Sequence, residues 1–161
     1  MIAVLQRVKS ARVSVDGRVT GECGEGFAIL LGVANGDDKL DADLLAAKIS
    51  KLRVFRDEND KMNRSIVDIG GSAVVVSQFT LLANYKHGNR PDFLSAAAPS
   101  VAEPLYEYFC DKLSSFVGND VGRGVFGADM LYEIANNGPV TIVMDSNVLK
   151  TKKNSQEREN I

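Results

Sequence analysis

The chain has 161 residues, of which 45% are hydrophobic and 25% charged, and its formal net charge is −2. This length suits one domain with a single core, and the composition is that of an ordinary soluble globular protein. The charge balance excludes a surface that attracts nucleic acid everywhere, so any RNA contact needs a local patch or a complementary shape. The N-terminal apolar run is too short for a signal peptide, and no segment nears the roughly 20 apolar residues that cross a bilayer. We therefore expect a cytoplasmic protein that makes no contact with a membrane.

The first part of the chain predicts three strand segments. Residues 2–8 mix apolar and polar side chains as a strand does. Residues 12–20 alternate around Asp16 and Gly17, a pair that supplies the positive φ angles of a tight hairpin turn. Residues 26–34 are apolar without alternation, which is typical of a strand covered on both faces.

An amphipathic helix is predicted at residues 37–52, after these strands. Asp38 is placed to cap its N-terminus, with Asp41 in the first turn, where the helix dipole favours a carboxylate. The apolar stripe of this helix consists of Leu40, Leu44, Leu45, Ile49 and Leu52.

A second helix is predicted at residues 99–116. Ser100 and Glu103 have the spacing of a capping box at its start. Its expected buried face consists of Val101, Leu105, Tyr108, Phe109, Leu113 and Phe116.

Further strands are predicted at residues 73–82, 130–136 and 139–146. Together these elements predict a mixed α/β fold, in which β-sheets pack together and two main helices cover one side. We expect one domain over residues 1–146. The polar residues 147–161 are interpreted as an unstructured, solvated tail or, alternatively, as a tail that contacts RNA phosphates.

Few side chains suited to acid–base or metal chemistry are present. Cys23 and Cys110 lie far apart in apolar surroundings and are interpreted as reduced, buried thiols, because a disulfide scaffold needs more cysteines in a shorter chain. Neither cysteine has the spacing of a metal-ligand pair, and His87 has no second histidine to join. The chain also lacks a P-loop and a GxGxxG pattern. We expect no metal and no organic cofactor.

The end of the strand at 73–82 changes from apolar to polar. Because side chains alternate along this strand, Val74, Val76, Gln78 and Thr80 are expected to share one face, which places an amide and a hydroxyl where the core ends. Such a place suits a small polar ligand, although a strand that simply meets solvent has the same pattern.

The segment "NNGPVT" at 136–141 is a second unusual stretch. Its Gly-Pro pair lies between two strand-like runs. This pattern indicates a turn, and an X-Pro bond can also adopt the cis form at modest cost.

Several short motifs, taken together, resemble the D-aminoacyl-tRNA deacylase family. They are "SQFTL" (77–81), "KHGNRPDF" (86–93), "FGADM" (126–130) and "NNGPVT" (136–141), in the order and spacing of that family. "LLGV" (30–33), "LRVF" (52–55), "KMN" (61–63) and the first 17 residues are also similar. The resemblance covers about residues 1–146.

The resemblance implies the fold of that family, a homodimer without cofactor, and hydrolysis of the ester between a D-amino acid and the terminal ribose of tRNA. This activity keeps D-amino acids, and mischarged glycine, out of translation. The motif Ser77, Gln78, Phe79 and Thr80 would line the aminoacyl pocket, with Thr80, Gln78 and Phe79 as the catalytic group. Met130 would lie near the terminal adenosine. Gly138 and Pro139 would form a cis bond that reaches the partner subunit's site and rejects L-amino acids.

The sequence departs from the family pattern at two positions. Asn137 stands where an Asp is common, and Val125 stands where an Arg often precedes Phe126. The change at Val125 puts a nearby phosphate or structural contact in doubt.

The resemblance also implies a mechanism in which the ribose 2′-hydroxyl of the substrate activates or places the attacking water, and this would account for the scarcity of acid–base residues. Backbone N–H groups around Gln78 and Phe79 would then stabilise the oxyanion. Two alternatives remain: a hydrolase of small esters that uses Thr80 or Ser77 with His87, and a non-catalytic nucleic-acid-binding module that uses the Lys86–Arg90 loop and the tail.

Overall fold

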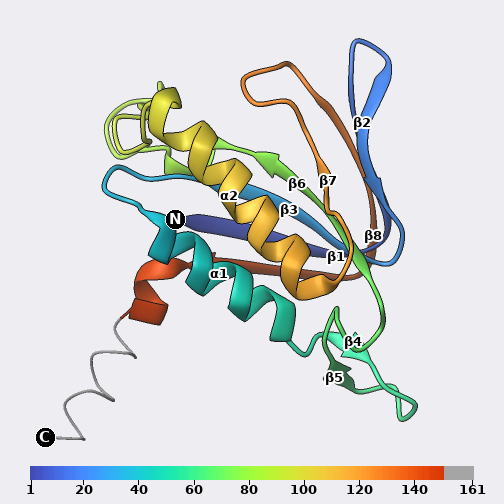
Figure 1. Cartoon of the computed structure of the whole chain (residues 1–161). Helices are drawn as coiled ribbons and strands as arrows, with labels where there is room; N and C mark the ends of the chain where they lie inside the picture. Colours follow the sequence, from blue (N-terminus) through green and yellow to red (C-terminus); the bar gives the residue numbers. More distant parts are fainter. Residues whose placement is uncertain (151–161) are drawn as a thin grey trace, which may run out of the picture.

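The computed structural model describes residues 1–150 (Figure 1). Its strands are β1 (Ile2–Val15), β2 (Arg18–Cys23), β3 (Gly26–Gly32), β4 (Phe55–Arg56), β5 (Met62–Arg64), β6 (Ser72–Ser77), β7 (Gly122–Arg123) and β8 (Leu131–Asp145). Its helices are α1 (Lys39–Lys51), the 3₁₀ helix η1 (Phe79–Leu82) and α2 (Pro99–Val117). Residues 146–150 are helical as well. No helix in this part of the chain is long and apolar enough to cross a membrane.

Six strands form one sheet, in the order β2-β1-β3-β6-β7, with β8 paired to β1. The pairs β3–β6 and β6–β7 are parallel, and the other pairs in this sheet are antiparallel. The sheet curls until β2 lies against β7, where the backbone of Arg123 leaves no room for a Cβ at Gly21. β4 and β5 form a separate two-stranded ribbon.

The helices α1 and α2 cover one face of this sheet (Figure 1). Leu5, Phe27, Ile29 and Val75 point from the sheet into the core beneath them. A second cluster lies on the opposite face and consists of Val8, Ala11, Val13, Ala28, Val74 and Val76. β3 therefore has core on both sides, as its unbroken apolar run predicts. The mixed α/β class with two helices on one side is confirmed.

The first helix begins as predicted, and the second does not. Asp38 caps α1, and the Asp41 side chain accepts from the Asp38 backbone N–H, which completes a capping box. The capping box predicted for α2 is wrong: its N-cap is Ala98, without a side-chain hydrogen bond, because Pro99 occupies the first helical position. The buried face of α2 also differs from the prediction, since Val101 and Phe116 are exposed while Ala102, Tyr106 and Cys110 are buried.

Several predicted segments differ from the structure. β6 ends at Ser77, so the strand expected over 73–82 is wrong beyond that residue, and η1 follows. A turn at 136–141 is also wrong, because β8 pairs with β1 on both sides of a register shift and runs through a cis Gly138–Pro139 bond. Residues 147–150, expected in an unstructured tail, are helical; the rest of that prediction lies outside the described residues.

Candidate active site

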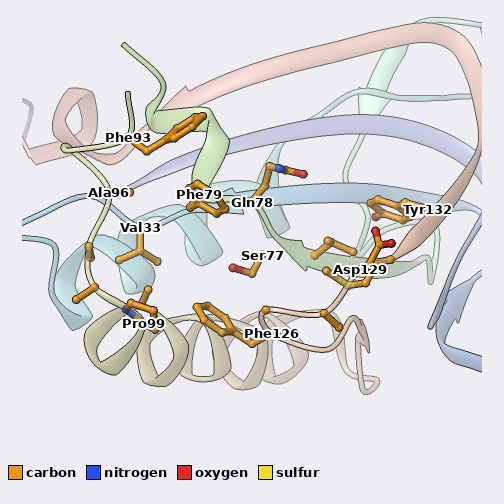
Figure 2. Close-up of a pocket in the computed structure, with 17 residues that line it drawn as sticks. Val33, Ser77, Gln78, Phe79, Phe93, Ala96, Pro99, Phe126, Asp129 and Tyr132 are labelled. Atoms are coloured by element: carbon orange, nitrogen blue, oxygen red, sulfur yellow. The ribbon is translucent and has the colours of Figure 1, made fainter. Parts of the chain in front are cut away.

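A cavity of about 680 Å³ opens where β6 ends (Figure 2). Its walls come from β6 and η1, from residues 93–98, from the first turn of α2 and from residues 126–132. The lining is mostly apolar, and the Ser77 side chain points into the open space. Among residues 1–150, Asp129 is the one acidic residue that lines it. A concave, largely apolar site with a few polar groups is typical of small-ligand binding.

The end of β6 positions the polar groups of this cavity. The Gln78 backbone N–H donates to the Leu31 carbonyl at 2.8 Å, which continues the β3–β6 ladder one residue beyond the strand. The backbone of Gln78 then turns the chain into η1. The Gln78 side-chain Nε2 donates to the Thr80 hydroxyl, so the two polar groups expected side by side do meet, although Thr80 does not line the cavity.

Phe79 and Phe93 form one wall of the cavity. Their rings meet edge to face, with centroids 5.0 Å apart and planes at 79°. Such a pair contributes about 1 kcal/mol beyond the area it buries. Phe79 is 54% exposed in the single chain, so this wall reaches the molecular surface.

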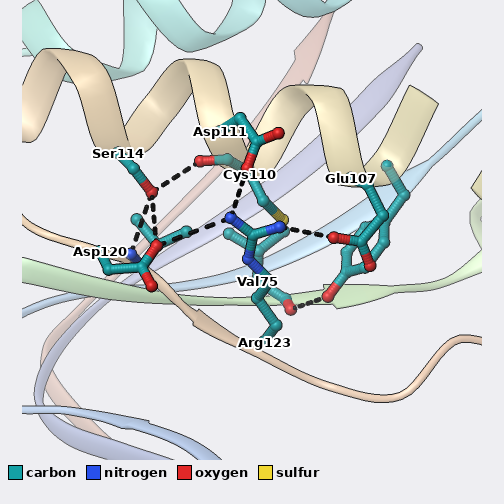
Figure 3. A network of polar contacts seen from close by, with 9 residues as sticks. Val75, Glu107, Cys110, Asp111, Ser114, Asp120 and Arg123 are labelled. Atoms are coloured by element: carbon teal, nitrogen blue, oxygen red, sulfur yellow. Dashed lines mark hydrogen bonds and ion pairs between the residues drawn. The ribbon is translucent and has the colours of Figure 1, made fainter. Parts of the chain in front are cut away.

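Residues 126–130 form the opposite wall, and the chain just before them is attached to α2 by Arg123 of β7 (Figure 3). The Arg123 guanidinium donates to Glu107 at 2.5 Å and to Asp111 at 2.7 Å, and it lies 3.6 Å from an Asp120 oxygen. Burial alone would lower the pKa of Arg123, but the hydrogen bonds to Asp111 and Glu107 raise it. The Gly124 N–H also donates to the Val75 carbonyl of β6. The chain is therefore fixed to both α2 and β6 just before the cavity wall begins.

Tyr132 closes the inner end of the cavity. Its hydroxyl accepts from the Ile29 N–H at 3.1 Å and donates to the Val74 carbonyl at 2.9 Å, so it bridges β3 and β6. Burial raises the pKa of this phenol, which keeps it protonated as a donor.

Gly138 and Pro139 are exposed on β8 and do not line this cavity. The backbone before them is held by Arg7, which is 3% exposed and donates to the Asn137 carbonyl and, at 2.7 Å, to the Val54 carbonyl. Gly138 has a φ of +135°, and a Cβ there would lie 3.1 Å from the Arg7 guanidinium. This position therefore requires glycine.

The cavity brings together four of the seven residues that the sequence singled out: Ser77, Gln78, Phe79 and Met130. Thr80 lies beside it, and Gly138 and Pro139 lie apart from it. Sequence reasoning assigned no role to Phe93, Phe126 or Asp129, although all three fall within the motifs quoted above. Tyr132 lies two residues after the motif "FGADM", and the sequence pattern did not indicate its position in the site.

Nucleophile–base pairs and metal clusters are not assembled in residues 1–150. The hydroxyls of Ser77 and Thr80 make no hydrogen bond to an acidic or basic side chain of the described residues, and His87 lies in an exposed loop outside the cavity. No group of three His, Cys, Asp or Glu side chains in this range is placed to hold a metal ion. Both cysteines are free, and burial raises the pKa of the Cys110 thiol to about 12, so this thiol is unreactive.

Comparisons with known proteins agree with the motifs. The model of the D-Tyr-tRNA(Tyr) deacylase family matches residues 4–145. A D-aminoacyl-tRNA deacylase of Phocaeicola vulgatus is 53% identical over 146 residues, which cover 91% of this chain and 97% of that protein. A relative of the same name from Roseiflexus castenholzii is 51% identical, over 98% of this chain and 100% of its own.

Solved structures share the fold. One described as "c-Myc DNA Unwinding Element Binding Protein" has a TM-score of 0.85 at 38% identity, covering 90% of this chain and 98% of its own. A second, "Structural Analysis of a probable eukaryotic D-amino acid tRNA deacylase", has a TM-score of 0.76 and covers 89% of this chain and 98% of its own. Its sequence identity is 16%, so this likeness shows the fold alone. The chain belongs to the D-Tyr-tRNA(Tyr) deacylase family.

Proposed function

We propose that this chain hydrolyses the ester of a D-aminoacyl-tRNA, and of mischarged glycyl-tRNA, as a proofreading step in the cytoplasm. Water adds to the ester carbonyl, the bond to the ribose 3′-oxygen breaks, and that oxygen leaves with a proton as free tRNA. The observation that carries the proposal is the cavity at Ser77–Phe79 and Met130, in a chain whose relatives at about half identity are D-aminoacyl-tRNA deacylases.

The protein's contribution to the chemistry is positioning. With no acidic or basic side chain bonded to the Ser77 or Thr80 hydroxyl within residues 1–150, the ribose 2′-hydroxyl is the group closest to the ester that can place water. The Gln78 N–H is already bonded to Leu31, so it is not free to stabilise an oxyanion as expected from the sequence. The Phe79 N–H, at the start of η1, takes this role.

Two copies pair so that Gly138 and Pro139 of each reach the other's cavity. Three observations support this arrangement: the two residues are exposed, they lie outside their own cavity, and β8 pairs only with β1 among the described strands. An exposed edge strand is a ready site for pairing with another chain. Val143, which is 69% exposed on the same strand, adds apolar surface for such a contact.

The carbonyls of Gly138 and Pro139 then accept hydrogen bonds from the substrate ammonium. With the amine fixed, a D side chain points to open space, whereas an L side chain meets backbone. Glycine has no side chain to reject and is therefore hydrolysed as well. Main chain suits this task because it cannot rotate away as a side chain does.

Release of amino acid from matched D-tyrosyl-tRNA and L-tyrosyl-tRNA by the purified protein tests the proposal. We expect fast hydrolysis of the D-ester and no acceleration of the L-ester over buffer. Equal rates for both esters would remove the chiral role, and no hydrolysis of either would remove the activity. His87→Ala is the control for the small-ester alternative and is expected to leave the rate unchanged.

A second candidate is a DNA-binding module, favoured by the description of the solved structure that is 38% identical. The formal net charge of −2 does not favour binding of duplex DNA through overall electrostatics. Titration of the protein with duplex DNA and with tRNA at several salt concentrations separates the two. Tighter binding of the duplex would support this candidate.

A further inference from the structure

Residues 84–92 form a projecting loop at the rim of the cavity, which we call the rim loop. Its two ends are joined by backbone hydrogen bonds in both directions between Asn84 and Asp92, at 2.9 and 3.0 Å, and by a side-chain bond between the same residues. The Lys86 N–H donates to the Asn84 side chain, which orders the first turn of the loop. The loop is thus closed at its base and presents its remaining side chains outward.

The rim loop is attached directly to the cavity. The residue after it is Phe93, which packs edge to face on Phe79. Asn35 then holds the next segment through bonds to the carbonyls of Leu94 and Ser95, at 2.7 and 2.9 Å. Figure 1 shows the chain passing from this region into the N-terminal end of α2, whose first turn lines the cavity. A ligand that leaves the cavity past Phe79 and Phe93 therefore meets the rim loop.

The exposed side chains of the rim loop combine positive charge with an aromatic ring. Tyr85 is 81% exposed. Lys86 and Arg90 are exposed and make no ion pair within residues 1–150, whereas Arg12, Arg56, Arg64 and Arg123 each contact a carboxylate. The rim loop also contains one carboxylate, Asp92, whose oxygens are bonded at the base of the loop to the Asn84 side chain and the Leu94 N–H. Its net charge is therefore positive, whereas Asp129 lies on the other side of the cavity (Figure 2).

We infer that the rim loop binds the unpaired RNA strand that precedes the terminal adenosine, with Lys86 and Arg90 on its phosphates and Tyr85 stacked on a base. This inference rests on the proposed function, since the cavity must hold the last nucleotide. Single-stranded nucleic acids bind where cations follow the backbone and aromatic rings accept bases, without need of sequence-specific contacts. Asp129 repels phosphate on the opposite side, which directs the strand over the rim loop.

The test compares two substrates. In the double variant Lys86→Ser, Arg90→Ser, KM for D-tyrosyl-tRNA is expected to rise about tenfold with kcat within about twofold, because phosphate contacts supply binding and not chemistry. Hydrolysis of 3′-(D-tyrosyl)adenosine, which lacks the preceding strand, should stay unchanged. Tyr85→Ala should raise KM for the tRNA about fivefold or more, while Tyr85→Phe, which keeps the ring, should not. Lys48→Ser, Lys51→Ser is the matched charge control on α1 and should leave both substrates unaffected.

A binding assay separates this inference from the proposed function. A hairpin of the acceptor-stem RNA that carries no amino acid and ends in unpaired ACCA should bind the double variant more weakly. The magnitude of the slope of log affinity against log salt should fall by about 1.4, because each of the two lost phosphate contacts on a single strand contributes roughly 0.7. A blunt-ended hairpin should show no difference between variant and wild type. If the wild-type protein hydrolyses neither D-tyrosyl-tRNA nor 3′-(D-tyrosyl)adenosine, the proposed function is contradicted. The hairpin assay then still tests whether the rim loop binds RNA. The inference would be overturned if the double variant and the wild type had the same KM for D-tyrosyl-tRNA and the same affinity for the hairpin. It would also be overturned if the variant lost activity equally on D-tyrosyl-tRNA and 3′-(D-tyrosyl)adenosine, or if its sedimentation coefficient changed.

Discussion

Arg7 donates from Nε to the Asn137 carbonyl at 3.0 Å, directly before the Gly138–Pro139 pair. Its Nη1 donates to the Val54 carbonyl, so one buried guanidinium fixes the backbone of β8 against the segment that precedes β4. A lysine has a single nitrogen and cannot hold both carbonyls in this geometry.

Arg7→Lys is therefore expected to loosen the backbone that carries the proposed chiral selection. The preference for D-tyrosyl-tRNA over L-tyrosyl-tRNA, measured as a ratio of kcat/KM, should fall, and the free energy of unfolding should drop by about 1–3 kcal/mol. Arg12→Lys is the matched control, because Arg12 lies on the same strand but is exposed and paired with Glu133. An unchanged D/L ratio in Arg7→Lys would show that the hydrogen bond from Arg7 does not contribute to chiral selection.

Thr80→Ala distinguishes positioning from nucleophilic attack. The Thr80 hydroxyl accepts a hydrogen bond from Gln78 and has no base beside it within residues 1–150. We expect kcat to fall by less than about 100-fold, whereas removal of an essential nucleophile costs several orders of magnitude. Thr20→Ala, on the exposed strand β2, controls for loss of a threonine hydroxyl. Complete loss of turnover in Thr80→Ala alone would assign the chemistry to this residue.

Replacement of the terminal ribose 2′-hydroxyl with hydrogen tests the role of the substrate. If that hydroxyl places the water, the enzymatic acceleration should fall by about 100-fold or more. The rate in buffer must be measured for both esters, because the hydroxyl also changes their intrinsic lability. If the enzyme accelerated hydrolysis equally with and without the 2′-hydroxyl, a group of the protein would have to place the water.

Arg123→Gln tests whether the attachment of β7 to α2 shapes the cavity. The substitution leaves Glu107, Asp111 and Asp120 close together without their cation, and we expect about 1–3 kcal/mol loss of stability and a raised KM with little change in kcat. Arg64→Gln, which breaks the exposed pair with Glu58, is the control and should alter neither. A lowered kcat at unchanged KM in Arg123→Gln would contradict this role.

Stability at low pH should depend on Asp41, which is buried and bonded to Ser146 and Lys150. Burial alone would raise its pKa, but these hydrogen bonds outweigh burial and lower the pKa from 3.8 to about 2. The folded pKa lies below the ordinary value, so the ionised form stabilises the fold fully above about pH 4, and this stabilisation disappears as the pH falls towards 2.

Urea unfolding of wild type and Asp41→Asn between pH 7 and pH 2 measures this effect. The difference in free energy of unfolding should shrink by about 2 kcal/mol as the pH is lowered. Ser146→Ala removes one donor and should move the loss of stability to higher pH. A difference that stays constant with pH would contradict the assignment to Asp41.

Local patterns predicted much of the fold. The hairpin turn at Asp16 and Gly17 has positive φ at both residues, and α1 has the predicted cap at Asp38. These features depend on residues that are neighbours in the chain, which is why the sequence shows them. The unbroken apolar run of β3 likewise predicted burial on both faces.

The errors arise where tertiary contacts override local pattern. Gly138–Pro139 has the composition of a turn, yet β1 pairs with β8 on both sides of it and Arg7 holds the intervening backbone. β6 stops at Ser77 because η1 begins immediately after Gln78, and no residue type there marks the change. In the site, the motif residues Ser77–Phe79 and Met130 could be predicted, but Tyr132 could not, because its position depends on the curl of the whole sheet.

Tyr132 contributes to the cavity and to the centre of the sheet at once. The ring forms part of the wall, while its hydroxyl joins the strands whose ends build that wall. A smaller residue at this position would enlarge the space for a bulkier ester but remove both hydrogen bonds of the Tyr132 hydroxyl to the sheet. A change of substrate scope at this position therefore also lowers stability, whereas truncation of Phe93, which makes no such bridge, gives up its ring contact with Phe79 and no hydrogen bond between strands.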